Sequence, residues 1–189
     1  MKPIHLIPLG ALTGPDDGPL PEPGLDILEH LAAALARTFR TPCRIRPETL
    51  DLSFALDERR NQYYSTAIIQ KLERVCDPDA RVLGVTACDL FVPVLTFVFG
   101  EAQLDGACAV VSTARLKEEF YGMPAREELL RERLVKEAAH ELGHTFGLRH
   151  CSDWQCVMAS SHAVERLDVK GTAFCKACSK PVLKNGYWM

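Results

Sequence analysis

One stretch, residues 140–158, constrains this chain more than any other part of the sequence, and it reads HELGHTFGLRHCSDWQCVM. His140 and His144 are four residues apart, so on a helix they lie on the same face, about one turn from each other. Two imidazoles in that arrangement can bind one zinc ion from the same side, and Glu141 between them can reach a water molecule at the metal. We therefore expect a helix that carries a metal site.

The residues after the second histidine predict how this helix ends and where a third ligand comes from. Gly147 suits the left-handed position at which many helices stop, and the chain can then turn to bring His150 to the same ion. Three neutral imidazoles leave the fourth position of zinc to water, as in catalytic sites, whereas structural sites are closed by protein ligands. We predict that His140, His144 and His150 bind a catalytic zinc ion.

The hydrophobic pattern of the same segment gives an independent check. Apolar side chains recur at helical spacing between residues 125 and 146, and His140 and His144 fall opposite the middle of that stripe. Histidines of an ordinary core would lie within the stripe, so we expect these two to be presented at a site. The stripe consists of Leu130, Leu134, Ala138, Leu142 and Phe146.

The full pattern His-Glu-x-x-His-x-x-Gly-x-x-His, followed by Met158, resembles that of the metzincin zinc peptidases. Cys151 directly after the third histidine, then Cys156 and the pair Cys175-x-x-Cys178, make the chain similar to archaemetzincins, a small branch with two zinc sites. The stretch from Met158 to Cys175 is one residue shorter than the family pattern, which affects the path of a loop and not the ligands.

The resemblance extends to residues 57–65 and 82–101 and implies further features. A turn containing Met158 would lie beneath the metal. An antiparallel edge strand would line the cleft and bind the substrate backbone, as sheet edges hold extended peptides elsewhere. By its order along the chain, Val94–Phe99 is the expected edge strand, although an ordinary core strand is an equally good interpretation of its apolar residues.

Four cysteines in two closely spaced pairs predict a second metal site. Cys151, Cys156, Cys175 and Cys178 can surround zinc as a closed tetrahedral, structural site. Two disulfides or unpaired thiols are the alternatives, but a Cys-x-x-Cys pair in a reducing compartment is more often a metal site. A zinc ribbon that contacts nucleic acid is not supported, because the nearby basic residues are scattered among acidic and apolar ones.

Composition excludes several classes of partner. The formal net charge of −3 gives no basic patch for nucleic acid, and no apolar run is long enough for a membrane helix. The first ten residues, MKPIHLIPLG, lack the pattern of a secretory signal, so we expect a cytoplasmic monomer with reduced thiols. The four isolated cysteines are then expected to be buried and inert. They are Cys43, Cys76, Cys88 and Cys108.

The order of predicted elements indicates an α/β fold with a metzincin-like mixed sheet, an active-site helix and a small C-terminal zinc-bound subdomain. We expect one catalytic domain, 1–189, divided into residues 1–147 and 148–189. The expected strands are Ile4–Ile7, Cys43–Arg46, Arg81–Thr86, Val94–Phe99 and Ala107–Ser112, and helices are expected over Leu25–Phe39, Ala67–Val75 and Ala125–Phe146.

These features together predict a zinc metalloprotease that hydrolyses peptide bonds in a peptide or protein substrate. Glu141 would act as general base, beside a catalytic and a structural zinc ion. An aminopeptidase would need an acidic group for the substrate amine, for which Asp89 or Glu101 are candidates. A zinc-binding module that engages peptides or proteins without cleaving them is the alternative from another class. A role near the cleft is considered for His162 only because it follows Met158 closely in the sequence.

Overall fold

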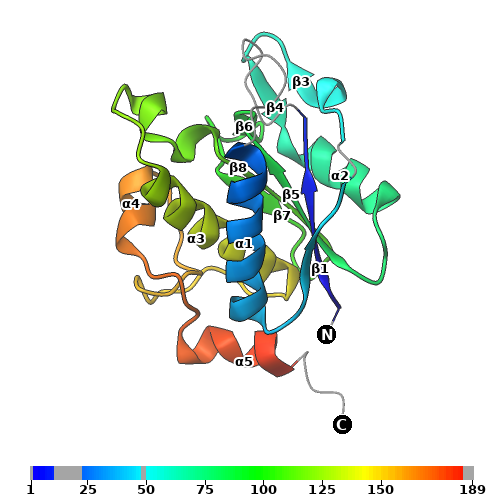
Figure 1. Ribbon diagram of the computed structural model, residues 1–189, viewed down its shortest axis with the longest axis vertical. Helices are drawn as coiled ribbons and strands as arrows, with labels where there is room; N and C mark the ends of the chain where they lie inside the picture. Colours follow the sequence, from blue (N-terminus) through cyan, green and yellow to red (C-terminus); the bar gives the residue numbers. More distant parts are fainter. Residues whose placement is uncertain (1, 11–22, 48–49, 185–189) are drawn as a thin grey trace.

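The computed structural model describes residues 2–10, 23–47 and 50–184, and these form a central sheet with helices against both faces (Figure 1). The helices are α1 (Pro23–Phe39), α2 (Ser65–Val75), α3 (Glu127–Thr145), α4 (Val164–Val169) and α5 (Lys176–Lys184), with short 3-10 turns at Ser53–Ala55, Ala114–Leu116 and Glu118–Tyr121. The strands are β1 (Ile4–Pro8), β2 (Cys43–Ile45), β3 (Leu56–Asp57), β4 (Gln62–Tyr64), β5 (Arg81–Thr86), β6 (Leu90–Phe91), β7 (Gly100–Ala102) and β8 (Cys108–Ser112).

The main sheet has five strands in the order β2-β1-β5-β8-β7. The first four are parallel, and β7 pairs with β8 in the antiparallel direction at one edge. A second sheet, β3-β4-β6, is small. The predicted mixed α/β sheet with an antiparallel edge strand is therefore confirmed.

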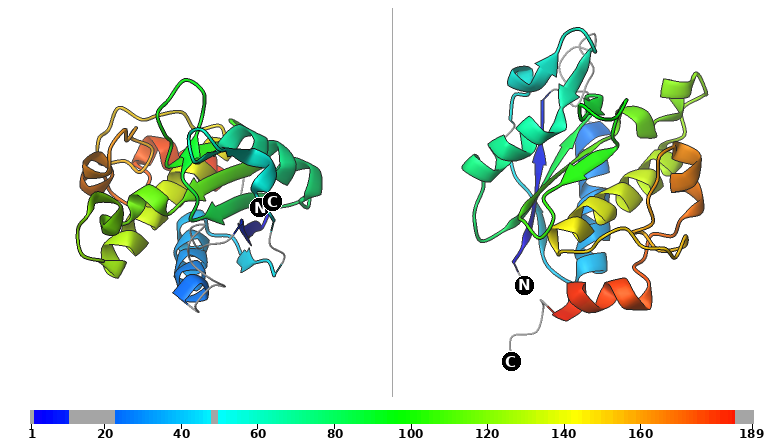
Figure 2. Two further views of the ribbon diagram at one scale, coloured as in Figure 1. Left: turned by 90° about the horizontal axis from the view of Figure 1, so that it is seen from above. Right: turned by 180° about the vertical axis from the view of Figure 1, so that it is seen from behind.

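Alternating residues of the strands face two separate hydrophobic clusters, as the pleat of a strand requires. Leu83 and Val111 pack with side chains of α1 and α3, whereas Val82 and Val110 pack with side chains of α2. The sheet thus separates α2 from α1 and α3, as the view from above shows (Figure 2). The cluster on the α3 side also contains Met158 and other residues of the C-terminal segment, so this segment shares the main core.

The expected edge strand Val94–Phe99 was placed wrongly. Residues 92–99 form a turn and an irregular loop, in which Val98 makes an isolated bridge to Leu90, and the edge strand begins at Gly100. The side chain of Arg60 donates to the carbonyls of Leu95 and Thr96, so these carbonyls do not take part in a ladder. The aromatic and β-branched residues of the loop line a cavity instead.

Helix α3 ends as its glycine predicts. Gly147 has a φ of 79°, its N–H donates to His144 O at 2.9 Å, and the N–H of Leu148 donates to Gly143 O at 3.2 Å. This pair of bonds is a Schellman motif, which satisfies the last carbonyls of a helix and reverses the chain. The reversal directs His150 back toward the helix.

Burial of α3 is wider than the apolar stripe predicts. His140 is only 4% exposed, whereas His144 is half-buried. The reason is tertiary, because Val157 and Met158 of the later chain are fully buried within the same cluster as α3. Figure 2 shows this later chain running beside α3 before it reaches α5. His140 still lines a cavity and clusters with His144 and His150, so burial does not remove it from the predicted site. No helix among the described residues could span a membrane.

Candidate metal centres and active-site cleft

The three predicted histidines converge on one point. One ring nitrogen from each of His140, His144 and His150 lies within 4.8 Å of the other two. The Nε2 atoms of His140 and His144 are 3.1 Å apart. Two nitrogens bound tetrahedrally to zinc at about 2.1 Å would lie about 3.4 Å apart, so the observed spacing fits a shared ion.

Backbone carbonyls fix which nitrogen of each helical histidine faces the ion. His140 Nδ1 lies 2.9 Å from Val157 O, and His144 Nδ1 lies 2.7 Å from Leu148 O. A carbonyl only accepts hydrogen bonds, so both Nδ1 atoms carry the proton. This assignment leaves lone pairs on both Nε2 atoms, which face each other at 3.1 Å. Facing lone pairs repel unless a cation lies between them, and the arrangement therefore fits a metal ion.

The protonation of the histidines supports the same conclusion, since metals bind neutral imidazole. Burial lowers the pKa of His140 to about 3, with the ammonium of Lys170 as the second cause. The pKa values of His144 and His150 are also lowered, and burial is the main cause for each. All three rings are therefore kept neutral at neutral pH.

Glu141 occupies the position that the sequence predicts for a general base. It is 5% exposed, and its pKa is raised well above its usual value by burial and by the nearby carboxylate of Glu137. A Cβ at Gly100 would come within 2.6 Å of Glu141 Cγ. The first residue of the edge strand therefore has to be glycine for this carboxylate to reach its place.

Met158 lies beneath the histidine helix, as the resemblance implies. It is fully buried, and a Cβ at Gly143 would overlap its sulfur atom. Gly143 directly precedes His144, so the methionine packs against α3 at the level of the metal ligands. The glycine inside the His-Glu-x-x-His motif is thus explained by close packing.

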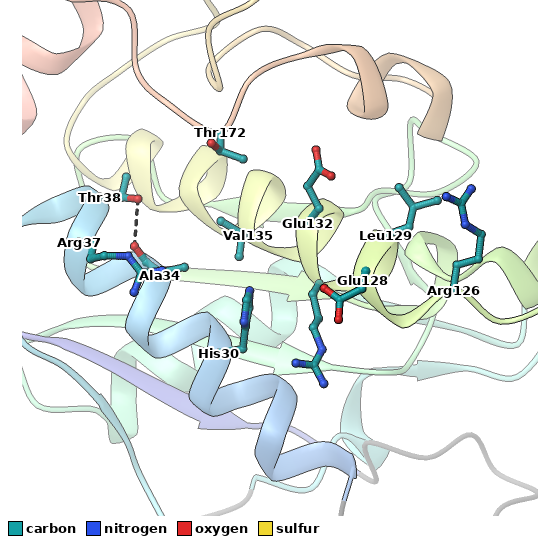
Figure 3. A pocket seen from close by; sticks show the side chains of 11 residues that line it. His30, Ala34, Arg37, Thr38, Arg126, Glu128, Leu129, Glu132, Val135 and Thr172 are labelled. Atoms are coloured by element: carbon teal, nitrogen blue, oxygen red, sulfur yellow. Dashed lines mark hydrogen bonds between the residues drawn. The ribbon is translucent and has the colours of Figure 1, made fainter.

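A cavity of about 300 Å³ opens beside these residues. It is lined by Glu137, His140 and Glu141 of α3, by His150, and by residues 95–100 and 160–162. A larger cavity of about 510 Å³ lies between α1 and α3, where His30 and Val135 face each other (Figure 3), but none of the candidate ligands lines it. Chemistry and not size identifies the candidate cleft.

The four predicted cysteine ligands also meet. The sulfur atoms of Cys151, Cys156, Cys175 and Cys178 lie within 4.8 Å of one another, and those of Cys151 and Cys175 are 3.9 Å apart. Sulfurs bound tetrahedrally to zinc at about 2.3 Å would be about 3.8 Å apart. All eight cysteines fall within the described residues, and all eight are free thiols. The geometry fits a closed four-sulfur site.

The isolated cysteines match their prediction in part. Cys108 is buried, and burial raises the pKa values of Cys43 and Cys108 to about 12, as expected of unreactive thiols. Cys43, Cys76 and Cys88 are half-buried, so burial is less complete than predicted.

The two clusters share one short loop. His150 directly precedes Cys151, and the N–H of Cys151 donates to Met158 O at 2.9 Å. Val157, whose carbonyl orients His140, directly follows Cys156. Any displacement of this loop would therefore reach both clusters.

Sequence reasoning missed a buried ion pair in the cleft. Lys170 is 3% exposed, and its ammonium lies 3.5 Å from Glu137 Oε2 and 3.3 Å from Ala159 O. Glu137 lies one turn before Glu141, so helical spacing places the two carboxylates on one face of α3. No sequence signal indicated that Lys170 would be the partner.

The carboxylates considered as partners for a substrate amine are already engaged. Arg115 binds Asp89 through two hydrogen bonds of 2.7 Å. Glu101 accepts hydrogen bonds from the hydroxyls of Ser65 and Thr66. Neither residue lines the cavity.

Comparisons with known proteins agree with this geometry. The sequence profile of peptidase family M54 matches residues 35–184. The archaemetzincin of Methanocaldococcus jannaschii is 40% identical over 164 residues, which cover 87% of this chain and 89% of the relative. The crystal structure of the archaemetzincin of Archaeoglobus fulgidus, complexed with malonate, has a TM-score of 0.76 at 37% identity and covers 95% of this chain and 99% of that chain.

A zinc-dependent peptidase from Methanocorpusculum labreanum has a TM-score of 0.79 at 28% identity and covers 95% of this chain and 99% of that one. The part of the chain that matches the family profile contains both the histidine and the cysteine cluster. The chain therefore belongs to peptidase family M54, the archaemetzincins, and is a zinc metallopeptidase.

Proposed function

We propose that this metallopeptidase holds two zinc ions with different tasks. His140, His144 and His150 hold the catalytic ion, and the four cysteines hold a structural ion. The observation that carries the first assignment is the pair of Nε2 lone pairs that face each other at 3.1 Å while both Nδ1 atoms are bonded to carbonyls. The closed set of four sulfurs supports the second assignment.

The chemistry follows from the residues around the cavity. A zinc ion held by the three imidazoles would supply a Lewis acid, which would polarise a peptide carbonyl and lower the pKa of a water molecule. Glu141 Oε accepts a proton from that water and later delivers it to the nitrogen of the leaving amine. Its raised pKa suits this exchange, since a carboxylate that holds a proton more tightly is a stronger base. No serine or cysteine nucleophile is needed.

The substrate is a peptide or protein, and we propose that its backbone pairs with the free edge of β7. That strand ends the main sheet, and its first residue, Gly100, lines the cavity beside Glu141. Cleavage within a chain is favoured over aminopeptidase activity, because Asp89 and Glu101 are engaged elsewhere.

The division at residues 147 and 148, the monomeric state and the cytoplasmic location remain predictions. Eight free thiols are compatible with a reducing compartment.

A cleavage screen with matched variants tests the proposal. Zinc-loaded wild type and Glu141→Gln would be incubated with a mixed peptide library, and products would be identified by mass spectrometry. We expect internal cleavage by the wild type and almost none by the variant. If the wild type binds library peptides and zinc but leaves every peptide intact, the alternative of a non-cleaving zinc module replaces the protease.

A further inference from the structure

One part of the cavity has no role in the mechanism above, namely the short segment Ser160–His162. Both of its flanks are fixed to the core. Ala159 is 8% exposed and its carbonyl accepts a hydrogen bond from Lys170, while Val164 at the start of α4 is 6% exposed. Ser160–His162 lie between these two points and therefore stay beside the cavity that they line.

Polar atoms around this cavity lack hydrogen-bond partners. Within the described residues, three buried side-chain polar atoms make no hydrogen bond, and two of them, Ser161 Oγ and Glu137 Oε2, belong to residues that line the cavity. The ammonium of Lys170 lies 3.5 Å from Glu137 Oε2. Because unpaired buried polar atoms are costly, their presence at one cavity points to a ligand that completes the bonds.

His162 has the side chain best suited to act on such a ligand. Its ring is exposed, and Nε2 lies 3.3 Å from Ser160 Oγ, while Nδ1 makes no hydrogen bond to any described residue. If the Ser160 hydroxyl donates to Nε2, the ring proton lies on Nδ1 and forms a free donor. His162 also contributes, after burial, to the lowered pKa of His150, so the two rings lie in the same part of the cleft.

We propose that His162 is a catalytic residue that donates a hydrogen bond to the oxygen of the scissile carbonyl. As the water oxygen bonds to the carbonyl carbon, the π electron pair of the C=O bond moves onto that oxygen, and His162 stabilises the negative charge. When the C–N bond breaks, the pair returns to re-form the carbonyl, and the amine leaves with the proton held by Glu141. The inference rests on the proposed function, because it assigns a role within that reaction.

Apart from the candidate metal ligands, the other side-chain donors that line the cavity are weaker candidates. They are the hydroxyls of Thr96, Ser160 and Ser161, and Ser160 already pairs with the His162 ring. Ser161 Oγ is buried below the cavity surface. An imidazole N–H is a stronger donor than a hydroxyl and reaches farther from the backbone.

The test compares zinc-loaded wild type, His162→Ala and His162→Gln, with His30→Ala as the matched control. His30 is a histidine on α1 beside the other cavity (Figure 3). We expect His162→Ala to lower kcat by about 10²-fold with KM within about twofold, as for other oxyanion donors. His162→Gln, which keeps an N–H donor, should retain more activity. Zinc content should stay unchanged, and His30→Ala should match wild type.

A binding measurement keeps the inference separate from the proposed function. A phosphinic peptide, which imitates the tetrahedral state, would be titrated into each protein by calorimetry. Binding to His162→Ala should be weaker by at least about tenfold. A kcat within about twofold of wild type together with equal binding would overturn the inference, as would loss of zinc from His162→Ala. If wild type cleaves no peptide, the proposed function fails, and the binding ratio alone then decides the role of His162. Absence of binding to wild type overturns both.

Discussion

The histidine cluster and the cysteine cluster lie on either side of one peptide bond, between His150 and Cys151, yet they are built in opposite ways. The histidine cluster borders a cavity, and backbone carbonyls orient two of its three rings, those of His140 and His144. The cysteine cluster has four candidate sulfur ligands, and none of its residues lines that cavity. A zinc site with three protein ligands keeps a coordination position for water or substrate and can be catalytic. A zinc site closed by four protein ligands stabilises the fold. The difference supports the proposed division of tasks between the two clusters.

The largest expected effect is a loss of activity at the histidine cluster, which we call the open cluster, with no change at the cysteine cluster, the closed cluster. Glu141→Gln should lower kcat by about 10² to 10⁴-fold, because the amide cannot accept the proton of the attacking water. Zinc content should not change, since Glu141 is not one of the proposed zinc ligands. The control is Glu128→Gln, a conservative change of an exposed glutamate on the same helix. A fully active Glu141→Gln protein would contradict the assigned role.

The next prediction asks whether the two clusters are independent. Cys175→Ser should weaken zinc binding at the histidines by about 10 to 100-fold, the usual cost of disturbing residues that orient ligands. The reason is the shared loop, since Val157 follows Cys156 and its carbonyl holds His140. Competition with a chelator would measure the affinity, and Cys76→Ser would serve as the control. Unchanged affinity would show that the closed cluster does not position the open one.

Packing beneath the open cluster gives a smaller effect. Gly143→Ala should lower the free energy of unfolding by about 1–3 kcal/mol, because its Cβ would overlap the Met158 sulfur. Shortening the neighbour in the double variant Gly143→Ala, Met158→Ala should recover part of the loss relative to the sum of the single changes. Urea denaturation of all four proteins measures this coupling. If the losses of unfolding free energy in the two single variants add up exactly in the double variant, residues 143 and 158 are not energetically coupled.

The smallest expected effect is a difference in thiol pKa, and therefore in reactivity, between two cysteines of the closed cluster. In zinc-free protein the pKa of Cys175 is lowered to about 7, chiefly by the N–H of Cys178, whereas burial raises the pKa of Cys178. A lowered thiol pKa favours the thiolate, so Cys175 should be half ionised near pH 7 and react with iodoacetamide before Cys178. Mass spectrometry of modified peptides across pH 6–9 measures the order. Equal reaction of both residues at pH 7 would contradict the assignment.

The sequence predicts this molecule best where the geometry is local. Four-residue spacing placed His140 and His144 together, and Gly147 takes the left-handed conformation that its position implied. Strand Arg81–Thr86 was predicted to the residue, because a short apolar run rich in β-branched residues suits a strand covered on both faces.

Prediction from the sequence fails where contacts between distant segments of the chain determine the structure. Val94–Phe99 has the composition of a strand, but hydrogen bonds from Arg60 keep it out of the sheet. His140 is buried because Val157 and its neighbours cover α3 from a later part of the chain. The pairing of Glu137 with Lys170 spans 33 positions that no periodic pattern connects. Local spacing can place ligands on a helix, whereas the second wall of a cleft depends on the whole fold.

The most direct test of two separate metal sites is the zinc content of purified wild type, His144→Ala and Cys178→Ser, measured by plasma mass spectrometry. We expect about two zinc ions per chain in wild type and about one in His144→Ala, with the remaining ion unaffected by the loss of the histidine. Cys178→Ser should lose the cysteine-bound ion and hold the other more weakly. One zinc ion per chain in wild type, unchanged in His144→Ala, would show that the histidines hold no metal and would contradict the account.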